Sequence, residues 1–360
     1  RFYRNLKASS LLSPCMKCAS EIYDVFTDVR TLITELNSDF EQYYRNFTPS
    51  TVLSPYTEQT SIFDLTDEHI TFMWYQLVID ILLHSSEESN GKNEMLNVCR
   101  IHYRTNETYL GKIDEFERTY KKEDAISWHT KDSFLYKVIN LALQKQSINI
   151  IYKFRLFLKD LYDQLCKLHK IYRQILLCDK SDTLNVFRTQ WIATDEVKKC
   201  QTNIGGLTAT TTFLSTSFSS EAALLFIAGY EEPIGRSDNT PVLFDIDIGT
   251  TTAKPFAYLH QNLNSETEKE LLLSIESTFR TESVEIINDE VLTVIKLIAC
   301  SSDEDFNLKN SKQNFKKILG IDRRHQDMKW GYLLFVIGEY KLAEQHYKIL
   351  LAKLTENDLN

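Results

Sequence analysis

The spacing of apolar residues changes near Leu176, and this change constrains the fold of the 360-residue chain more than any other feature. Before Leu176, apolar residues recur at intervals of three and four, which is typical of amphipathic helices. This part of the chain therefore predicts an all-helical layer. Helices are expected over Asp67–Leu83, Asn93–Tyr103, Ser133–Gln144 and Ile148–Tyr172.

After Leu176 the sequence consists mainly of short runs rich in Val, Ile, Phe and Thr, separated by turn-forming residues. One apolar helix is expected among them, at Ser220–Ala228, with Ser219 as its N-cap. Strands without regular strand–helix alternation indicate an α+β domain built on an antiparallel or mixed sheet. The expected strands are Leu184–Thr189, Thr211–Thr216, Val242–Ile248, Leu271–Ile275, Val284–Ile287 and Leu292–Ala299.

Both ends of the chain are expected to lie outside this domain. Thr48–Thr60 and Ser301–Asn314 are polar stretches that are typical of linkers. Trp330–Leu351 has its glycine, tyrosine and alanine residues placed as in one tetratricopeptide helix–turn–helix unit. One unit cannot bury its own apolar face, so either more units follow or it packs on the main domain. A simple helical hairpin explains the pattern equally well. The expected division is a variable segment and linker (1–60), a main domain (61–300, helical to 175 and β-rich from 176), a linker (301–325) and a helical unit (326–360).

Charge and composition argue against several classes of function. A net charge of −9 disfavours sequence-independent nucleic-acid binding, which needs a basic surface. No apolar run approaches the length of a membrane span. The ten glycines form neither a Gly-x-Gly-x-x-Gly fingerprint nor a phosphate-binding loop, so Rossmann and P-loop sites are not expected. Metal ligands do not cluster either, and we expect no metal.

The seven cysteines are odd in number and irregularly spaced, which favours a reducing compartment such as the cytoplasm over a disulfide framework. Cys15 and Cys18 form a lone Cys-x-x-Cys, for which two free thiols are the simpler interpretation than a zinc site. The sequence starts at Arg1 without a leader, so we expect a fragment or a processed chain.

Three polar motifs follow one another along the β-rich part. The first is Arg188, in the run Phe187–Gln190. Burying an unpaired arginine is costly, so an arginine inside a strand suggests an anionic partner such as a diphosphate or a carboxylate. Taken alone, an arginine on the solvent face of an edge strand is the simpler explanation.

The other two motifs carry hydroxyls and carboxylates. Ser215–Ser217 ends a strand just before a helix, where hydroxyls can orient a carboxylate or bind a ribose, although an ordinary capping sequence looks the same. Glu268 and Glu270 are two apart, so in extended backbone both can face one cleft. Paired carboxylates suit a reaction through an oxocarbenium-like state. Because Glu266 is close by, a solvated acidic loop is the alternative.

Together the motifs resemble the R-S-E class of arginine-specific mono-ADP-ribosyltransferases. Phe187–Gln190 corresponds to that family's aromatic-Arg-Gly-Gln, Ser215–Ser217 to its Ser-Thr-Ser, and Glu268 with Glu270 to its Glu-x-Glu. The helical part and the terminal unit are similar to multi-domain members from invertebrates, notably rotifers. The resemblance implies a helical N-terminal layer, a split β-sandwich holding an NAD cleft, and a tetratricopeptide-like C-terminal unit.

The resemblance also implies roles for individual residues, with NAD as the ADP-ribose donor and a protein arginine as the acceptor. Arg188 would hold the NAD phosphates, and Ser215 would support the catalytic carboxylate. Glu270 would stabilise the ribosyl cation as nicotinamide leaves, and Glu268 would orient and help deprotonate the acceptor guanidinium. The cofactor contacts are assigned to Arg188, Thr189, Gln190, Ser215, Thr216, Ser217 and Glu270.

Two positions depart from the family pattern. A second Glu-x-Glu also leaves open which pair of glutamates corresponds to the family's motif. Thr189 stands where the family has glycine, and Glu276 replaces the glycine of a Gly-Ser turn. Glu266 and Glu268 also form a Glu-x-Glu, but only Glu270 directly precedes the apolar run Leu271–Leu273. The departures leave open a degenerate domain that binds proteins together with its helical repeat. An NAD glycohydrolase, with water as acceptor, is the other alternative.

Overall fold

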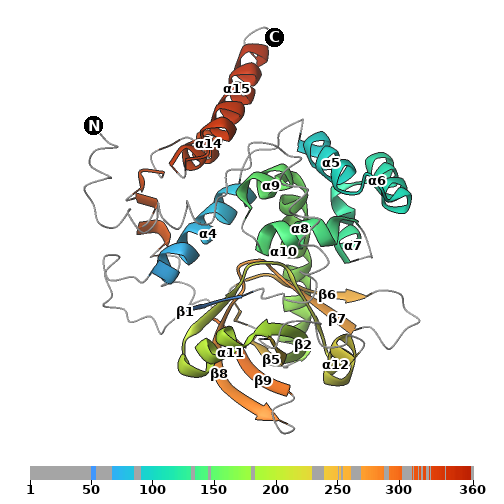
Figure 1. Ribbon diagram of the computed structural model, residues 1–360, viewed down its shortest axis with the longest axis vertical. Coiled ribbons are helices and arrows are strands. Elements are labelled where there is room, and N and C mark those ends of the chain that lie inside the picture. The colour runs from blue at the N-terminus through green and yellow to red at the C-terminus, as the bar shows by residue number, and fades with distance from the viewer. Residues whose placement is uncertain are drawn as a thin grey trace.

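A helical layer lies over a mixed, mostly antiparallel sheet in the computed structural model (Figure 1). The C-terminal helices α14 and α15 lie beyond this layer, on the side away from the sheet. The structure describes residues 50–53, 67–84, 91–130, 134–144, 147–179, 183–228, 239–249, 251–252, 254–260, 269–287, 292–301, 310, 312–314, 316–317, 319–321, 324, 326–336 and 338–357.

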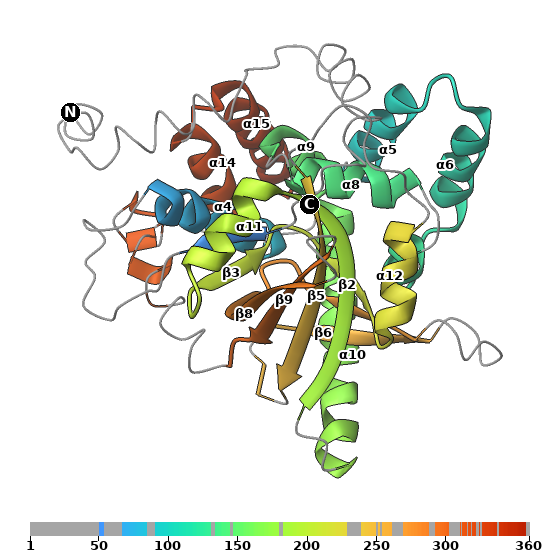
Figure 2. The same ribbon diagram turned by 60° about the horizontal axis from the view of Figure 1, so that its bottom comes forward.

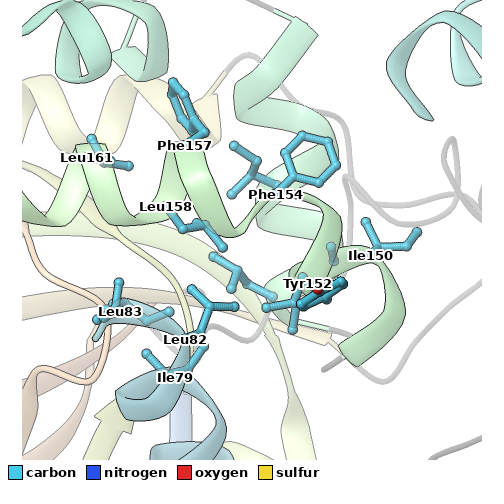
Figure 3. Close-up of a cluster of buried hydrophobic side chains, with 14 of the residues drawn as sticks. Ile79, Leu82, Leu83, Ile150, Tyr152, Phe154, Phe157, Leu158 and Leu161 are labelled. Carbon is cyan, nitrogen blue, oxygen red and sulfur yellow. The ribbon is translucent and has the colours of Figure 1, made fainter. Parts of the chain in front are cut away.

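The helical layer is built around one large apolar core. Its bulkiest fully buried side chains include Phe116, Phe134 and Phe157, and Figure 3 shows the part of the core that contains Leu82, Phe154 and Leu158. Its helices are α4 (Asp67–Leu83), α5 (Gly91–His102), α6 (Glu107–Thr119), the 3-10 turn η2 (Lys122–Asp124), α7 (Ala125–Thr130), α8 (Phe134–Gln144), α9 (Ile148–Lys153) and α10 (Arg155–Asp179).

The helices predicted near α4, α5 and α8 are confirmed within one or two residues at each end. The single helix predicted over 148–172 is wrong, because the chain breaks at Phe154 (φ −92°, ψ 4°) into α9 and α10. The break leaves the Phe154 side chain only 1% exposed in the core, a tertiary contact that the periodicity does not reveal. Helix α6 was not predicted, since only Ile113 and Phe116 of its 13 residues are buried.

The sheet has nine strands in the order β1-β3-β8-β9-β5-β2-β4-β7-β6, and every neighbouring pair is antiparallel except β5 and β9. The strands are β1 (Ser50–Leu53), β2 (Thr183–Ala193), β3 (Leu207–Thr210), β4 (Leu214–Ser217), β5 (Asn239–Gly249), β6 (Phe256–His260), β7 (Lys269–Leu273), β8 (Thr278–Ile287) and β9 (Leu292–Ala299).

A single residue pair, Phe187 with Ser217, joins β2 to β4 and so divides the sheet into two parts. We call this junction the seam. Side chains from both parts, such as Val186 and Phe244 on one side and Leu214 and Leu271 on the other, share one apolar cluster. The two parts therefore pack face to face as in a sandwich, and the seam keeps them joined in one sheet.

The strand predicted over Thr211–Thr216 is divided, because β3 ends at Thr210 and β4 starts at Leu214. Since β3 pairs with β8 and β4 with β7, the chain crosses here from one part of the sheet to the other. Helix α12 (Ser220–Ala228) is confirmed, and the Ala222 N–H donates to Ser219 Oγ at 3.1 Å, which confirms the N-cap. A second helix, α11 (Thr194–Thr202), was missed because only Val197 and Cys200 of it are buried.

The C-terminal pair α14 (Gln326–Val336) and α15 (Tyr340–Asn357) packs on the main domain. Trp330 stacks on Tyr152 of α9, with ring centroids 5.2 Å apart and planes 7° apart. The Tyr152 hydroxyl hydrogen-bonds to Nδ1 of His346 at 3.0 Å. The helical pair therefore packs on the preceding domain.

At the other end, Ser50–Leu53 forms β1 and pairs with β3, although it lies in a stretch expected to be a linker. Cys15 and Cys18 lie outside the described residues. Over the ranges given above, no helix combines the length and the apolar character needed to cross a bilayer.

Candidate active site

Arg188 bridges the seam between the two parts of the sheet. Its Nη1 donates to the carbonyl oxygen of Ser215 on β4 at 2.7 Å, and its Nε donates to Oε1 of Gln190 at 3.4 Å. Strand β2 lies between β5 and β4, so Arg188 is not on an edge strand, and its side chain is half-buried. The simpler explanation, an arginine facing solvent from an edge strand, is therefore excluded.

Ser215 connects the arginine to a carboxylate. On β4, Ser215 lies opposite Leu272 of β7, and Ser217 lies opposite Glu270. Residues facing each other across an antiparallel pair project to the same side, so Ser215, Ser217 and Glu270 share one face. On that face the Ser215 hydroxyl donates to Oε1 of Glu270. Arg188, Ser215 and Glu270 thus form one hydrogen-bonded chain across three strands.

Thr216 and Ser217 hold the local backbone. The Thr216 side chain is 3% exposed, and its hydroxyl donates to the carbonyl of Leu271 at 2.8 Å, which fixes β4 to β7. The Ser217 hydroxyl accepts from the Ser219 N–H at 3.1 Å at the start of the turn into α12. Both hydroxyls therefore position the strand that carries Ser215.

Glu270 is the second residue of β7, and the three leucines that follow it are buried, as predicted. These leucines fix the strand between β4 and β6, so that the backbone under Glu270 is held from both sides. Glu268 and Glu266 lie outside the described residues.

Thr189 and Gln190 point in different directions. The Thr189 hydroxyl donates to the carbonyl of Ala223 in α12, and the side chain is 8% exposed. Gln190 lies beside Arg188, and its buried Nε2 finds no hydrogen-bond partner in the part of the chain that the structure describes. A buried donor left unsatisfied costs about 1–3 kcal/mol.

A buried histidine, to which the sequence analysis assigned no role, lies beside the approach to β4. His129 of α7 is 1% exposed, and its ring centroid is 5.6 Å from that of Phe213, two residues before Ser215. Burial lowers the pKa of His129 to about 4, so its imidazole is neutral near pH 7. No motif identifies this residue, because it occupies an ordinary apolar position of a short helix.

Glu276 lies in the turn between β7 and β8 and has φ +64°. This is the left-handed region that favours glycine. Here the backbone cost is offset by a buried ion pair, with Oε2 of Glu276 3.0 Å from Nζ of Lys254 and 3.9 Å from Nζ of Lys312. Burial, together with the nearby Glu276 charge, raises the pKa of Tyr75. The contacts of Glu276 therefore indicate a role in holding this turn.

No known protein-family model matches the sequence, and no curated protein is significantly similar to it. Solved structures similar to this chain include bacterial ADP-ribosyltransferases. The Vis toxin from Vibrio splendidus is 15% identical over 68% of this chain and 90% of its own (TM-score 0.31). Plx2a from Paenibacillus larvae is 15% identical over 55% and 94% (TM-score 0.34). C3stau2 from S. aureus, solved with NAD, is 15% identical over 54% and 94% (TM-score 0.33). At such TM-scores the likeness by itself decides neither fold nor chemistry.

Proposed function

We propose that this protein is a mono-ADP-ribosyltransferase that takes NAD as its donor and modifies arginine side chains of proteins. The observation that carries the proposal is the hydrogen-bonded chain from Arg188 through Ser215 to Glu270. The order of these three groups along the sheet seam corresponds to the order of a diphosphate, a ribose and a scissile glycosidic bond.

Each group of the chain suits one part of the donor. The Arg188 guanidinium presents a planar set of donors that fits a diphosphate. The Ser215 hydroxyl fixes the rotamer of Glu270 and can also meet the nicotinamide ribose. A carboxylate held in advance near the anomeric carbon stabilises the positive charge that develops as the bond to nicotinamide breaks.

The proposal assigns Glu268 to the acceptor guanidinium. A guanidinium is almost fully protonated at neutral pH, so transfer to its nitrogen needs a neighbouring carboxylate that accepts a proton. We assign that role to Glu268, two residues before Glu270, on the family resemblance alone. With water as the acceptor instead, the same site would release free ADP-ribose.

The two departures from the family pattern do not weaken the site. Thr189 directs its hydroxyl to α12, and Glu276 is engaged with Lys254 in the turn beyond β7. Neither side chain enters the chain of contacts between Arg188 and Glu270. These placements favour an active enzyme over a degenerate protein-binding module.

The test is transfer of label from NAD to agmatine or polyarginine by the whole chain, with Glu270→Gln as the inactivating variant. Glu282→Gln is the matched control, because Glu282 is a half-exposed residue of β8 paired with Lys296. We expect label transfer in wild type and Glu282→Gln and none in Glu270→Gln. Nicotinamide release without label transfer would indicate a glycohydrolase. A folded wild type that gives neither product, and no thermal shift with NAD, would overturn the proposal.

A further inference from the structure

The seam leaves β2 and β4 attached by one backbone pair, although Arg188 and Ser215 lie on either side of it. One backbone pair does not fix the distance between β2 and β4, so other contacts must fix it. Helix α12 supplies them, because it packs against β2, β4 and β5. Figure 2 shows α12 beside β2.

One end of α12 is fixed to β4. Only Phe218 and Ser219 separate the end of β4 from the helix. The Ser219 N–H donates to the Ser217 hydroxyl, and the Ser219 hydroxyl accepts from the Ala222 N–H, each at 3.1 Å. These two bonds leave little freedom between the strand and the first turn of the helix, so α12 moves with β4.

The other attachment reaches β2 through Thr189. Its hydroxyl donates to the carbonyl of Ala223, one turn into α12, from a side chain that is 8% exposed. Successive side chains of a strand project to opposite faces, so Thr189 contacts the helix from one face of β2 while Arg188 occupies the other. Glycine at this position has no side chain with which to make the contact.

We propose that Thr189 is a positioning residue, whose hydrogen bond to α12 clamps the seam and sets Arg188 relative to Ser215 and Glu270. This inference rests on the proposed function, in which Arg188 binds the donor phosphates. Because Arg188 is the group that holds the phosphates, a shift of Arg188 relative to Ser215 should weaken NAD binding and appear mainly in KM.

The test compares Thr189→Val, which keeps the shape but loses the donor, with Thr189→Ser, which keeps the hydroxyl. We expect Thr189→Val to raise KM for NAD about tenfold with a smaller change in kcat, and Thr189→Ser to stay within about twofold of wild type. The matched control is Thr252→Val, because the buried Thr252 hydroxyl donates to the Gly249 carbonyl at 2.7 Å away from the seam. It should leave KM for NAD unchanged.

Amide hydrogen exchange of the peptide 220–228 measures the clamp without any activity. Faster exchange in Thr189→Val than in Thr189→Ser supports the clamp, and equal exchange overturns it. Equal KM values for Thr189→Val and wild type would also overturn the positioning role. A wild type that neither cleaves nor binds NAD would instead contradict the proposed function, while the exchange rates would still decide whether Thr189 holds α12.

Discussion

Glu270 and Glu276 are six residues apart, at the start of β7 and in the turn just after it, but their surroundings differ. Glu270 is half-buried and accepts a hydrogen bond from the neutral Ser215 hydroxyl. The Glu276 side chain is 5% exposed and pairs with the ammonium group of Lys254 at 3.0 Å. A hydroxyl is thus one partner of the first glutamate, and an ammonium group is a partner of the second.

The difference separates a carboxylate suited to chemistry from one suited to structure. The Ser215 hydroxyl fixes the orientation of Glu270, and a carboxylate held in this way can stabilise a developing cation. An ammonium group at 3.0 Å balances the charge of Glu276 and so offsets the free-energy cost of burying that carboxylate. Proximity along the chain therefore says little about the role of each glutamate.

Glu270→Gln should have the largest effect and should act on catalysis alone. The amide keeps the size of the side chain but removes the negative charge, so NAD cleavage and arginine transfer should both fall by at least about 10³-fold. The melting temperature should stay close to that of wild type. Initial rates with labelled NAD and a thermal melt give the two values. A large loss of stability would mean that Glu270 is structural as well.

Glu276→Ala should show the opposite behaviour. It leaves the Lys254 ammonium buried without this carboxylate, and the free energy of unfolding should fall by about 3 kcal/mol. Glu276→Gly should be less destabilised than Glu276→Ala by about 1 kcal/mol, because φ is +64°. Urea unfolding of both variants measures this, and equal midpoints would contradict the assigned backbone strain.

Protonation of His129 should lower the free energy of unfolding rather than affect catalysis. The pKa of His129 is lowered from 6.5 to about 4, so between these values the unfolded chain binds more protons than the folded one. Stability is therefore fully present above pH 6.5 and is lost as the pH falls toward 4. Between pH 7.5 and pH 5, the free energy of unfolding of wild type should therefore fall by about 2 kcal/mol more than that of His129→Phe.

Urea unfolding of wild type and His129→Phe at both pH values measures this difference. Part of the pH dependence should remain, because burial also lowers the pKa of His102 to about 4. An unchanged pH dependence in His129→Phe would show that His129 does not titrate in this window.

Ser215→Ala should give the smallest of these effects and act through Glu270. Without the hydroxyl, Glu270 keeps its charge but loses its fixed rotamer, so transfer should fall by roughly 10- to 100-fold. Rates of transfer and of NAD cleavage should fall together. A loss as large as that of Glu270→Gln would mean that Ser215 contacts the reacting atoms itself.

The sequence by itself indicated the three polar groups, the α+β class and several elements, because these depend on short-range patterns. Helix α12 with its Ser219 cap and strand β9 were predicted at their observed bounds. The apolar run Leu271–Leu273 identified β7 and placed Glu270 at its start. Periodicity and capping extend over a few residues, so they can be recognised without a structure.

The tertiary structure decided how these groups meet. Arg188 reaches Ser215, 27 positions along the chain, and Ser215 reaches Glu270, 55 positions further, only because β2, β4 and β7 are neighbours. The contact of Thr189 with α12 and the partners of Glu276 are likewise long-range. Strand order and register follow from how distant apolar faces pack together, and no local pattern encodes that packing.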